Sequence, residues 1–293
     1  MRLALIGATG LLGRRVLARW LEQGREVRVL CRADSTHALP SASRADAVVG
    51  DLFDDGAMSR LVENCDTVAN LATALKPLNG VVDWQANDRI RREGTRQLLR
   101  ACQRAGVQRL VQQSVAFVDS GERLDDGLGP LAPLPHLASA SDMEAAVEQS
   151  GMQALILRGG LFWGPGTSMQ AWMESQGHDQ PARGLGNTEA DWVSLIHLDD
   201  MAHAVAEAAT AGLTGRLAIV DGEPLRWREL IAGLAAACGR SPAARPGLGA
   251  LPSFRVTDSA AVRVLNFQAQ RRVRELFGPA GGTGHHREAG PNR

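Results

Sequence analysis

The 293-residue sequence has no tyrosine, and among its 32 basic residues lysine occurs once, at Lys76, the rest being arginine. Any mechanism that needs a tyrosine phenol is therefore excluded, and any that needs a lysine amine must use Lys76. Acidic residues also number 32, so the formal net charge is zero. A chain with this balance has no general attraction for nucleic acid or for an acidic membrane surface, and we expect neither as a partner.

Long apolar runs and paired cysteines are also missing. No apolar run reaches the roughly 18 residues that a membrane span needs, so no membrane segment is expected. The four cysteines are widely scattered, without a CxxC pair or a spacing typical of metal sites. This pattern predicts reduced thiols in a cytoplasmic protein and no bound metal.

Short apolar runs alternate with helical patterns through the first half of the chain. Strands are expected at residues 3–6, 27–30, 47–49, 67–71, 110–113 and 154–157, and helices at 11–22, 54–62, 84–105 and 141–149. A further helix, a strand and another helix are expected at 199–211, 217–220 and 226–238. This rhythm predicts the α/β class, with a parallel sheet that has helices on both faces.

Three glycines separate the first expected strand from the first expected helix, in the segment Gly7-Ala8-Thr9-Gly10-Leu11-Leu12-Gly13. The first glycine permits a tight turn, the second lets the backbone approach a pyrophosphate, and the third lets the helix pack closely on the strand. The N-terminus of the helix offers free N–H groups to the anion. The segment predicts a Rossmann-type doubly wound sheet and a dinucleotide site, although a purely structural turn would also use these glycines. The expected cofactor contacts in this loop are Gly7, Thr9, Gly10, Leu11, Leu12 and Gly13.

The glycine loop resembles that of the extended and atypical short-chain dehydrogenases/reductases, the group that contains the NAD-dependent epimerases and dehydratases. Further segments resemble this family in the expected order over about residues 1–240: Gly50-Asp51-Leu52, Asn70-Leu71-Ala72, Glu93-Gly94-Thr95, Leu157-Arg158-Gly159-Gly160 and Ile196-His197-Leu198-Asp199-Asp200. The resemblance implies cofactor contacts from Asp51, Leu52, Leu71 and Ala72.

The composition changes after Gly159, where glycine, proline and tryptophan gather. With the resemblance, this change predicts a dinucleotide-binding domain over 1–158 and a smaller C-terminal substrate lobe over 159–277 that is interleaved with it. Residues 278–293, rich in glycine, are expected to form a disordered tail. The resemblance places Phe162 and Trp163 on the side of a small-molecule substrate, with core packing as the alternative, and makes a homodimer possible.

The choice of cofactor is expected to depend on the end of the second strand. An acidic residue there would hold the ribose 2′-hydroxyl of NAD, whereas an arginine can hold the 2′-phosphate of NADP. Arg32 at this place favours NADP over NAD, while Asp34 leaves selection of NAD open. Lys76 follows the fourth strand and is a candidate for contact with a cofactor phosphate, or else an ordinary loop lysine.

The family's catalytic tyrosine and lysine are replaced. Ser114 matches the catalytic serine at the end of the fifth strand. When the next helix is aligned on Ser139 and Glu144, the tyrosine position holds His136 and the lysine position holds Ala140. The absence of tyrosine from the whole chain agrees with this alignment.

This replacement leaves several functions open. In the first, a nicotinamide exchanges hydride with a carbonyl or alcohol carbon, Ser114 holds the oxygen, and His136 is the general acid and base, since imidazole titrates near neutral pH. In the second, the chemistry is lost and the protein is an NADP-binding regulator or scaffold. In the third, the same cleft serves a non-redox lyase or isomerase. Arg91 also stands where the family usually has asparagine.

Overall fold

The computed structural model describes residues 1–39, 45–75, 83–118, 137–175, 188–239, 251–256 and 259–277. The sequence-based predictions for Lys76, for His136 and for the tail over 278–293 fall outside these ranges. In the part of the chain that is described, no helix is both long enough and apolar enough to cross a bilayer.

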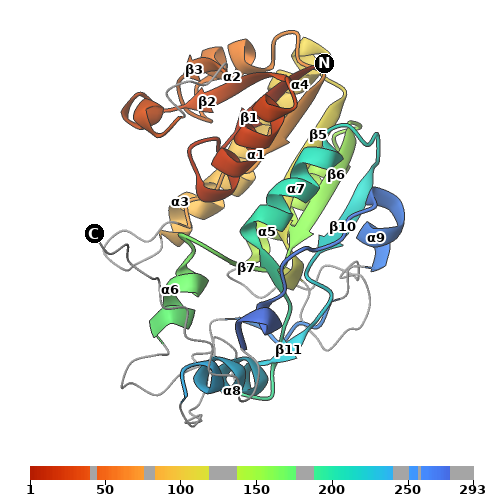
Figure 1. Ribbon diagram of the computed structural model, residues 1–293. Coiled ribbons are helices and arrows are strands. Elements are labelled where there is room, and N and C mark those ends of the chain that lie inside the picture. Colours follow the sequence, from red (N-terminus) through yellow and green to blue (C-terminus); the bar gives the residue numbers. More distant parts are fainter. Residues whose placement is uncertain are drawn as a thin grey trace, which may run out of the picture.

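A seven-stranded parallel sheet forms the centre of the molecule, in the order β10-β6-β5-β4-β1-β2-β3 (Figure 1). The strands are β1 (Arg2–Ile6), β2 (Glu26–Cys31), β3 (Asp46–Val49), β4 (Thr67–Asn70), β5 (Arg109–Val115), β6 (Gln153–Gly159) and β10 (Gly215–Ile219). The predicted α/β class with a Rossmann-type parallel sheet is confirmed. The direction of strand succession reverses between β1 and β4, and in such sheets ligands bind at this point, beyond the carboxyl ends of the strands.

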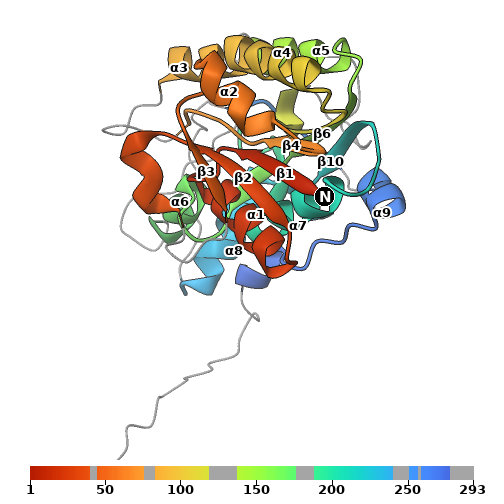
Figure 2. The same cartoon turned by 90° about the horizontal axis from the view of Figure 1, so that it is seen from above.

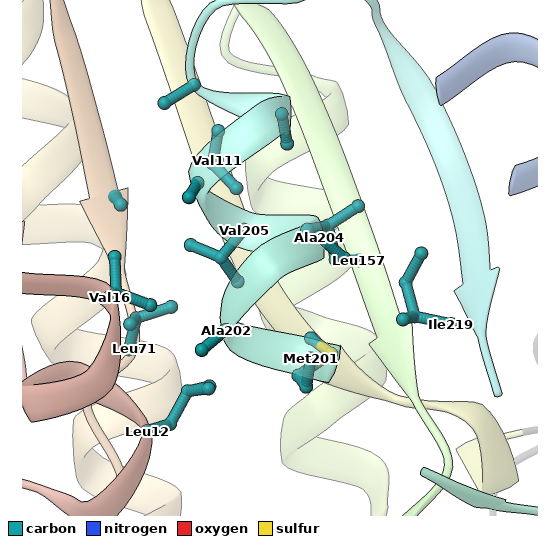
Figure 3. Close-up of a cluster of buried hydrophobic side chains, with 14 of the residues drawn as sticks. Leu12, Val16, Leu71, Val111, Leu157, Met201, Ala202, Ala204, Val205 and Ile219 are labelled. Atoms are coloured by element: carbon teal, nitrogen blue, oxygen red, sulfur yellow. The ribbon is translucent and has the colours of Figure 1, made fainter. Parts of the chain in front are cut away.

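Helices cover both faces of the sheet (Figure 2). One face carries α1 (Leu11–Glu22) and α7 (Leu198–Ala208), which pack on each other and on the strands through one apolar cluster. Figure 3 shows Leu12 and Val16 of α1 beside Ala202 and Val205 of α7 in this cluster. The other face carries α2 (Asp55–Val62), α3 (Trp84–Arg89), α4 (Thr95–Ala105) and α5 (Ala138–Glu148).

The single helix predicted over 84–105 contains a turn of π-helix, η2 (Ile90–Gly94), between α3 and α4. Gly94 lies in this turn against Leu52, and a Cβ at Gly94 would come within 2.2 Å of the Leu52 side chain. The turn also places the Arg91 side chain in the interior. Helical periodicity does not distinguish such a turn from continuous α-helix, so the apolar pattern could not reveal it.

Residues beyond 158 build a second cluster and also complete the sheet layer. The pairs β7 (Leu161–Trp163) with β9 (Leu195–His197) and β8 (Trp192–Val193) with β11 (Leu225–Arg226) lie below the main sheet, with α6 (Ser168–Ser175), α8 (Trp227–Ala237) and the short helix η5 (Val273–Phe277). Their apolar side chains form a separate core. Strand β10 and helix α7, from the same half of the chain, belong to the seven-stranded sheet and its cover. The remaining short elements are η1 (Ala33–Ala38), η3 (Ala116–Val118) and α9 (Ser259–Leu265).

Candidate cofactor and active site

The glycine loop joins β1 to α1 with very little space around it. Gly7 has a φ of +85°, and a Cβ there would come within 2.9 Å of the Leu71 carbonyl group. A Cβ at Gly13 would lie 2.0 Å from the Gly7 carbonyl oxygen. Gly13 therefore lets α1 approach the end of β1 this closely, and Gly7 lets the loop pass next to Leu71 after β4.

The N-terminus of α1 has the properties of an anion site. Gly10 is the N-cap residue, so no side chain caps the first turn, and that turn holds no acidic residue. The unpaired N–H groups at a helix start and the positive end of its dipole attract a phosphate. A Cβ at Gly10 would meet nothing closer than the Gly7 oxygen at 3.2 Å. The loop residues Gly7 to Gly13 therefore fit a dinucleotide pyrophosphate.

A cavity of about 420 Å³ lies at the carboxyl ends of β2 and β3. It is lined by Arg32, Ala33, Asp34, Val49, Gly50, Asp51 and Asp54. The predicted residues Arg32 and Asp51 thus lie together, on the side of the sheet where the glycine loop begins. Leu52 differs from them, because its side chain is buried against α2 and η2 and belongs to the core.

The two side chains expected to select the cofactor contact each other. The Arg32 side chain is 71% exposed, and its Nε lies 3.5 Å from the Asp34 carboxylate. Asp34 also accepts a hydrogen bond from the Ser35 hydroxyl, which lowers the pKa of Asp34 together with the charge of Arg32. An exposed ion pair of this length contributes little, so Arg32 can turn to a phosphate at small cost.

The end of β4 continues this edge beside the glycine loop. The Leu71 N–H donates to the Ile6 carbonyl oxygen, and the Leu71 carbonyl group faces Gly7. Ala72 donates its N–H to the Asn70 side chain, which in turn donates to Gln112 of β5 at 3.0 Å. Leu71 and Ala72 are therefore held by backbone and amide contacts next to the predicted pyrophosphate position.

Ser114 is part of a buried polar cluster. Its hydroxyl donates to the Glu144 carboxylate at 2.5 Å, and Arg158 holds the same carboxylate with its Nη2 2.7 Å from Oε2. Arg158 and Glu144 are fully enclosed, and Ser114 is buried. To hold a substrate oxygen, Ser114 would have to release a charged acceptor, so its predicted catalytic role stays a prediction. The sequence contained Glu144 and Arg158 in recognisable segments, but nothing in their spacing of 14 residues indicated that they pair.

The position of the missing lysine is filled by packing. Ala140 is fully buried and lies among Val115, Val118 and Phe117 at the end of β5. One residue earlier, the Ser139 hydroxyl accepts a hydrogen bond of 3.4 Å from Arg91. Burial lowers the pKa of Arg91, and the charge of Glu144 is among the opposing influences. Arg91, noted in the sequence only as a departure from asparagine, is therefore a buried cation of η2 that contacts the first turn of α5.

Of the two residues expected on the substrate side, Trp163 is buried in the separate core below the main sheet, where its ring and the His197 ring are nearly perpendicular with centroids 4.6 Å apart. Burial lowers the pKa of His197, so the imidazole is neutral near pH 7, and its Nδ1 accepts the Asp199 N–H. Phe162 is partly buried and packs over Gly159. The partial burial of Phe162 is compatible with contact to a substrate. The Trp163 ring is enclosed by core side chains.

The loop after β7 also contacts the glycine loop directly. A Cβ at Gly166 would lie 3.0 Å from Leu11, and Gly166 has a φ of +89°. Arg15 of α1 donates to the carbonyl oxygens of Leu11 and Pro165 and to the Asp199 carboxylate at 2.7 Å. These contacts hold the loop after β7 and the start of α7 against the N-terminus of α1. Within the described ranges, no group of three or more His, Cys, Asp and Glu side chains could hold a metal ion.

Comparison with known proteins agrees with this geometry. Residues 7–212 match the family described as NAD(P)H-binding. A 3-diazoavenalumate denitrifying reductase from a Streptomyces species is 32% identical over 261 residues, which cover 83% of each chain. A 3-beta-hydroxysteroid dehydrogenase from Mycolicibacterium neoaurum is 28% identical over 283 residues, covering 87% of this chain and 73% of the relative.

Solved structures show the same fold. The UDP-glucose 4-epimerase of Thermus thermophilus in complex with NAD has a TM-score of 0.76 at 22% identity, over 94% of this chain and 96% of the epimerase. MoeE5 in complex with UDP-glucuronic acid and NAD has a TM-score of 0.77 at the same identity and coverage. The chain belongs to the NAD(P)H-binding family, within the extended and atypical short-chain dehydrogenases/reductases.

Proposed function

We propose that the protein is an NADP(H)-dependent reductase that acts on a small molecule by hydride transfer. The observation that carries this proposal is the glycine loop at the uncapped N-terminus of α1, with Arg32 at the rim of the adjacent cavity. In this proposal the backbone of the loop from Gly7 to Gly13 holds the pyrophosphate, and Leu71 and Ala72 border it. A nicotinamide bound there supplies the hydride.

The preference for NADP(H) follows from the charges at the cavity. A ribose 2′-phosphate pairs with a guanidinium through two charge-assisted hydrogen bonds, and the exposed Arg32 has donors free to turn toward it. Asp34 would repel that phosphate, but its carboxylate is already engaged by Ser35 and by Arg32. Arg32 therefore outweighs Asp34 in this proposal.

Cofactor titration tests the proposal. Energy transfer from the six tryptophans to bound NADPH or NADH reports binding. We expect NADPH to bind more tightly, and Arg32→Ala to weaken it about 10-fold to 100-fold, the value of charge-assisted hydrogen bonds, while NADH binding hardly changes. Arg96→Ala, on the exposed side of α4, is the matched control. Binding of neither nucleotide would refute the cofactor site, and equal loss of both would refute the role of Arg32.

The reaction has two candidate forms. Reduction of a carbonyl leaves an alkoxide that needs a proton, and for this form His136 with Ser114 remains the proposed proton donor and oxygen ligand. The hydroxysteroid dehydrogenase relative supports this chemistry by its name. His136→Ala should then abolish turnover and leave NADPH binding intact.

The second form is favoured by the absence of tyrosine and by the relative named as a denitrifying reductase of a diazo compound. An aryl carbon that carries a diazonium group gains hydride, loses dinitrogen and becomes a C–H carbon. No alkoxide forms, so this chemistry has no use for the missing phenol. Freshly diazotised 2-aminophenol is a suitable probe, with one dinitrogen released for each NADPH oxidised.

The two forms and the alternatives are separated by the same assays. NADPH oxidation with aldehydes and ketones, lost in His136→Ala, supports the carbonyl form. Matched NADPH oxidation and dinitrogen release supports the diazo form. Tight NADPH binding without turnover of either substrate class would replace the reductase with a regulator or scaffold that binds the cofactor.

A further inference from the structure

Arg91 is a buried cation that the proposed chemistry has not used. It lies in the π-turn η2, and its residue is only 5% exposed. An arginine stays protonated in proteins, so this guanidinium carries a full charge inside the molecule. Placing such a charge out of water is costly unless an anion or several acceptors surround it.

The described part of the chain offers Arg91 little compensation. Its one hydrogen bond there is the 3.4 Å contact from Nη1 to the Ser139 hydroxyl, and no carboxylate of the described residues forms an ion pair with it. Glu144 is occupied by Arg158 and Ser114, and Asp88 pairs with Arg92. Both acids attract Arg91 only at longer range.

The guanidinium lies next to the carboxyl end of β5. Ser139, its partner, is in the first turn of α5, and the following residue, Ala140, packs against Val115 and Val118. The remaining guanidinium nitrogens are not among the fully enclosed unpaired polar atoms of the described residues, so the guanidinium is not completely shielded even though the residue is only 5% exposed. The carboxyl ends of the strands are the edge at which such sheets bind ligands.

We infer that Arg91 binds a carboxylate of the substrate, and that the substrate is an anion with an apolar body. Paired hydrogen bonds between a guanidinium and a carboxylate supply the charge and the acceptors that Arg91 lacks. The apolar body would meet Phe117, which is partly buried beside Ala140. This inference rests on the proposed function, because it assigns the substrate side of the same cleft.

In this inference the anion is distinct from the 2′-phosphate that Arg32 would hold. The pyrophosphate position lies at β1, and the 2′-phosphate position lies at the end of β2 beside Arg32. Strand β5 is separated from β2 by β4 and β1, which places it about 14 Å away across three strand spacings. The two cations therefore serve different ends of the site.

Calorimetric titration of the NADP-saturated protein tests the inference, with three pairs of probes: benzoate and benzamide, cinnamate and cinnamamide, octanoate and octanamide. Each amide matches its acid in shape but lacks the charge. We expect at least one acid to bind about 10-fold to 100-fold more tightly than its amide. Arg91→Met should abolish this preference, and Arg91→Lys should restore part of it. Arg96→Met, which removes an exposed charge from the same helical segment, should leave it unchanged.

Separate outcomes overturn the inference and the proposed function. An NADPH titration on each variant checks folding and the cofactor site, and Arg91→Met should bind NADPH as the wild-type protein does. If the wild-type protein binds no NADPH, the proposed function fails. If NADPH binds but no acid is preferred to its amide, or if Arg91→Met keeps the preference, the assignment of Arg91 is wrong. Should Arg91→Met not fold, Arg91→Lys and the wild-type comparison still decide.

Discussion

Two alanine substitutions in the glycine loop should separate folding from cofactor binding. At Gly13 the added Cβ would lie 2.0 Å from the Gly7 oxygen and 2.7 Å from the Gly7 carbonyl carbon. These are backbone atoms, so relief requires α1 to move away from β1. At Gly10 the nearest atom is 3.2 Å away and the backbone is in an extended conformation that alanine adopts readily. The two substitutions should therefore differ in how much they lower the free energy of unfolding.

For Gly13→Ala we expect a loss of about 3 kcal/mol, at the upper end of the range for overpacking. In a chain of this size, with an unfolding entropy of about 2.1 cal/mol/K per residue, that corresponds to a fall in Tm of about 5 °C. NADPH binding should also be lost, because the N–H groups of α1 move with the helix. For Gly10→Ala we expect a change of less than about 1 kcal/mol but markedly weaker NADPH binding, since the methyl group occupies the approach of the pyrophosphate.

Thermal unfolding followed by circular dichroism and the NADPH titration measure both effects. Gly24→Ala is the control, because Gly24 has a φ of +70° with open space around its Cβ position. It should lose about 1 kcal/mol from the left-handed backbone alone and bind NADPH normally. Gly13→Ala with the Tm and NADPH affinity of the wild-type protein would refute the packing argument.

Two further predictions concern buried charges. Arg158→Met leaves the fully enclosed Glu144 without its guanidinium, so it should lower the free energy of unfolding, measured by urea titration, by about 3–5 kcal/mol. The double variant that adds Glu144→Leu should recover part of this loss. A loss below about 1 kcal/mol in the single variant would contradict the prediction. Burial raises the pKa of Asp221 to about 7, so the folded protein keeps a proton that the unfolded chain releases near pH 4. The free energy of unfolding should therefore fall as the pH rises from about 4 to 7 and level off above pH 7. Asp221→Asn should remove this pH dependence. The difference in unfolding free energy between the wild-type protein and the variant should therefore change by up to about 4 kcal/mol between pH 4 and pH 8. A difference that is the same at both pH values would contradict the assignment to Asp221.

The sheet was predictable because parallel strands covered on both faces are continuous apolar runs. Each of the seven expected strands overlaps an observed one, and α1 has the expected bounds. The short pairs β7–β9 and β8–β11 were not predicted, because strands of two or three residues carry no periodicity. Helix α5 begins at Ala138 rather than at the expected 141, since Ser139 and Ala140 carry no apolar pattern although both are buried.

The cofactor side of the site was more predictable than the reaction side. The glycine loop is a local signal, because the turn, the close approach and the helix start occur within seven residues. The partners of Ser114 and Arg91 are not local, since they lie 30 and 48 residues away in the sequence. Their contacts depend on how α5 and the π-turn pack over β5, which no pattern in either segment indicates.

The contribution of α7 and β10 to the sheet layer has a consequence for how the chain is made. Helix α1 buries its apolar face against α7, which is synthesised far later. At about 5–20 residues per second the ribosome needs roughly 10–40 s to reach the end of α7. During that interval the apolar face of α1, including Leu12, Val16 and Trp20, lacks its native cover. We therefore expect chaperones to bind the nascent protein. A fragment that stops at residue 158 should aggregate rather than bind nucleotide.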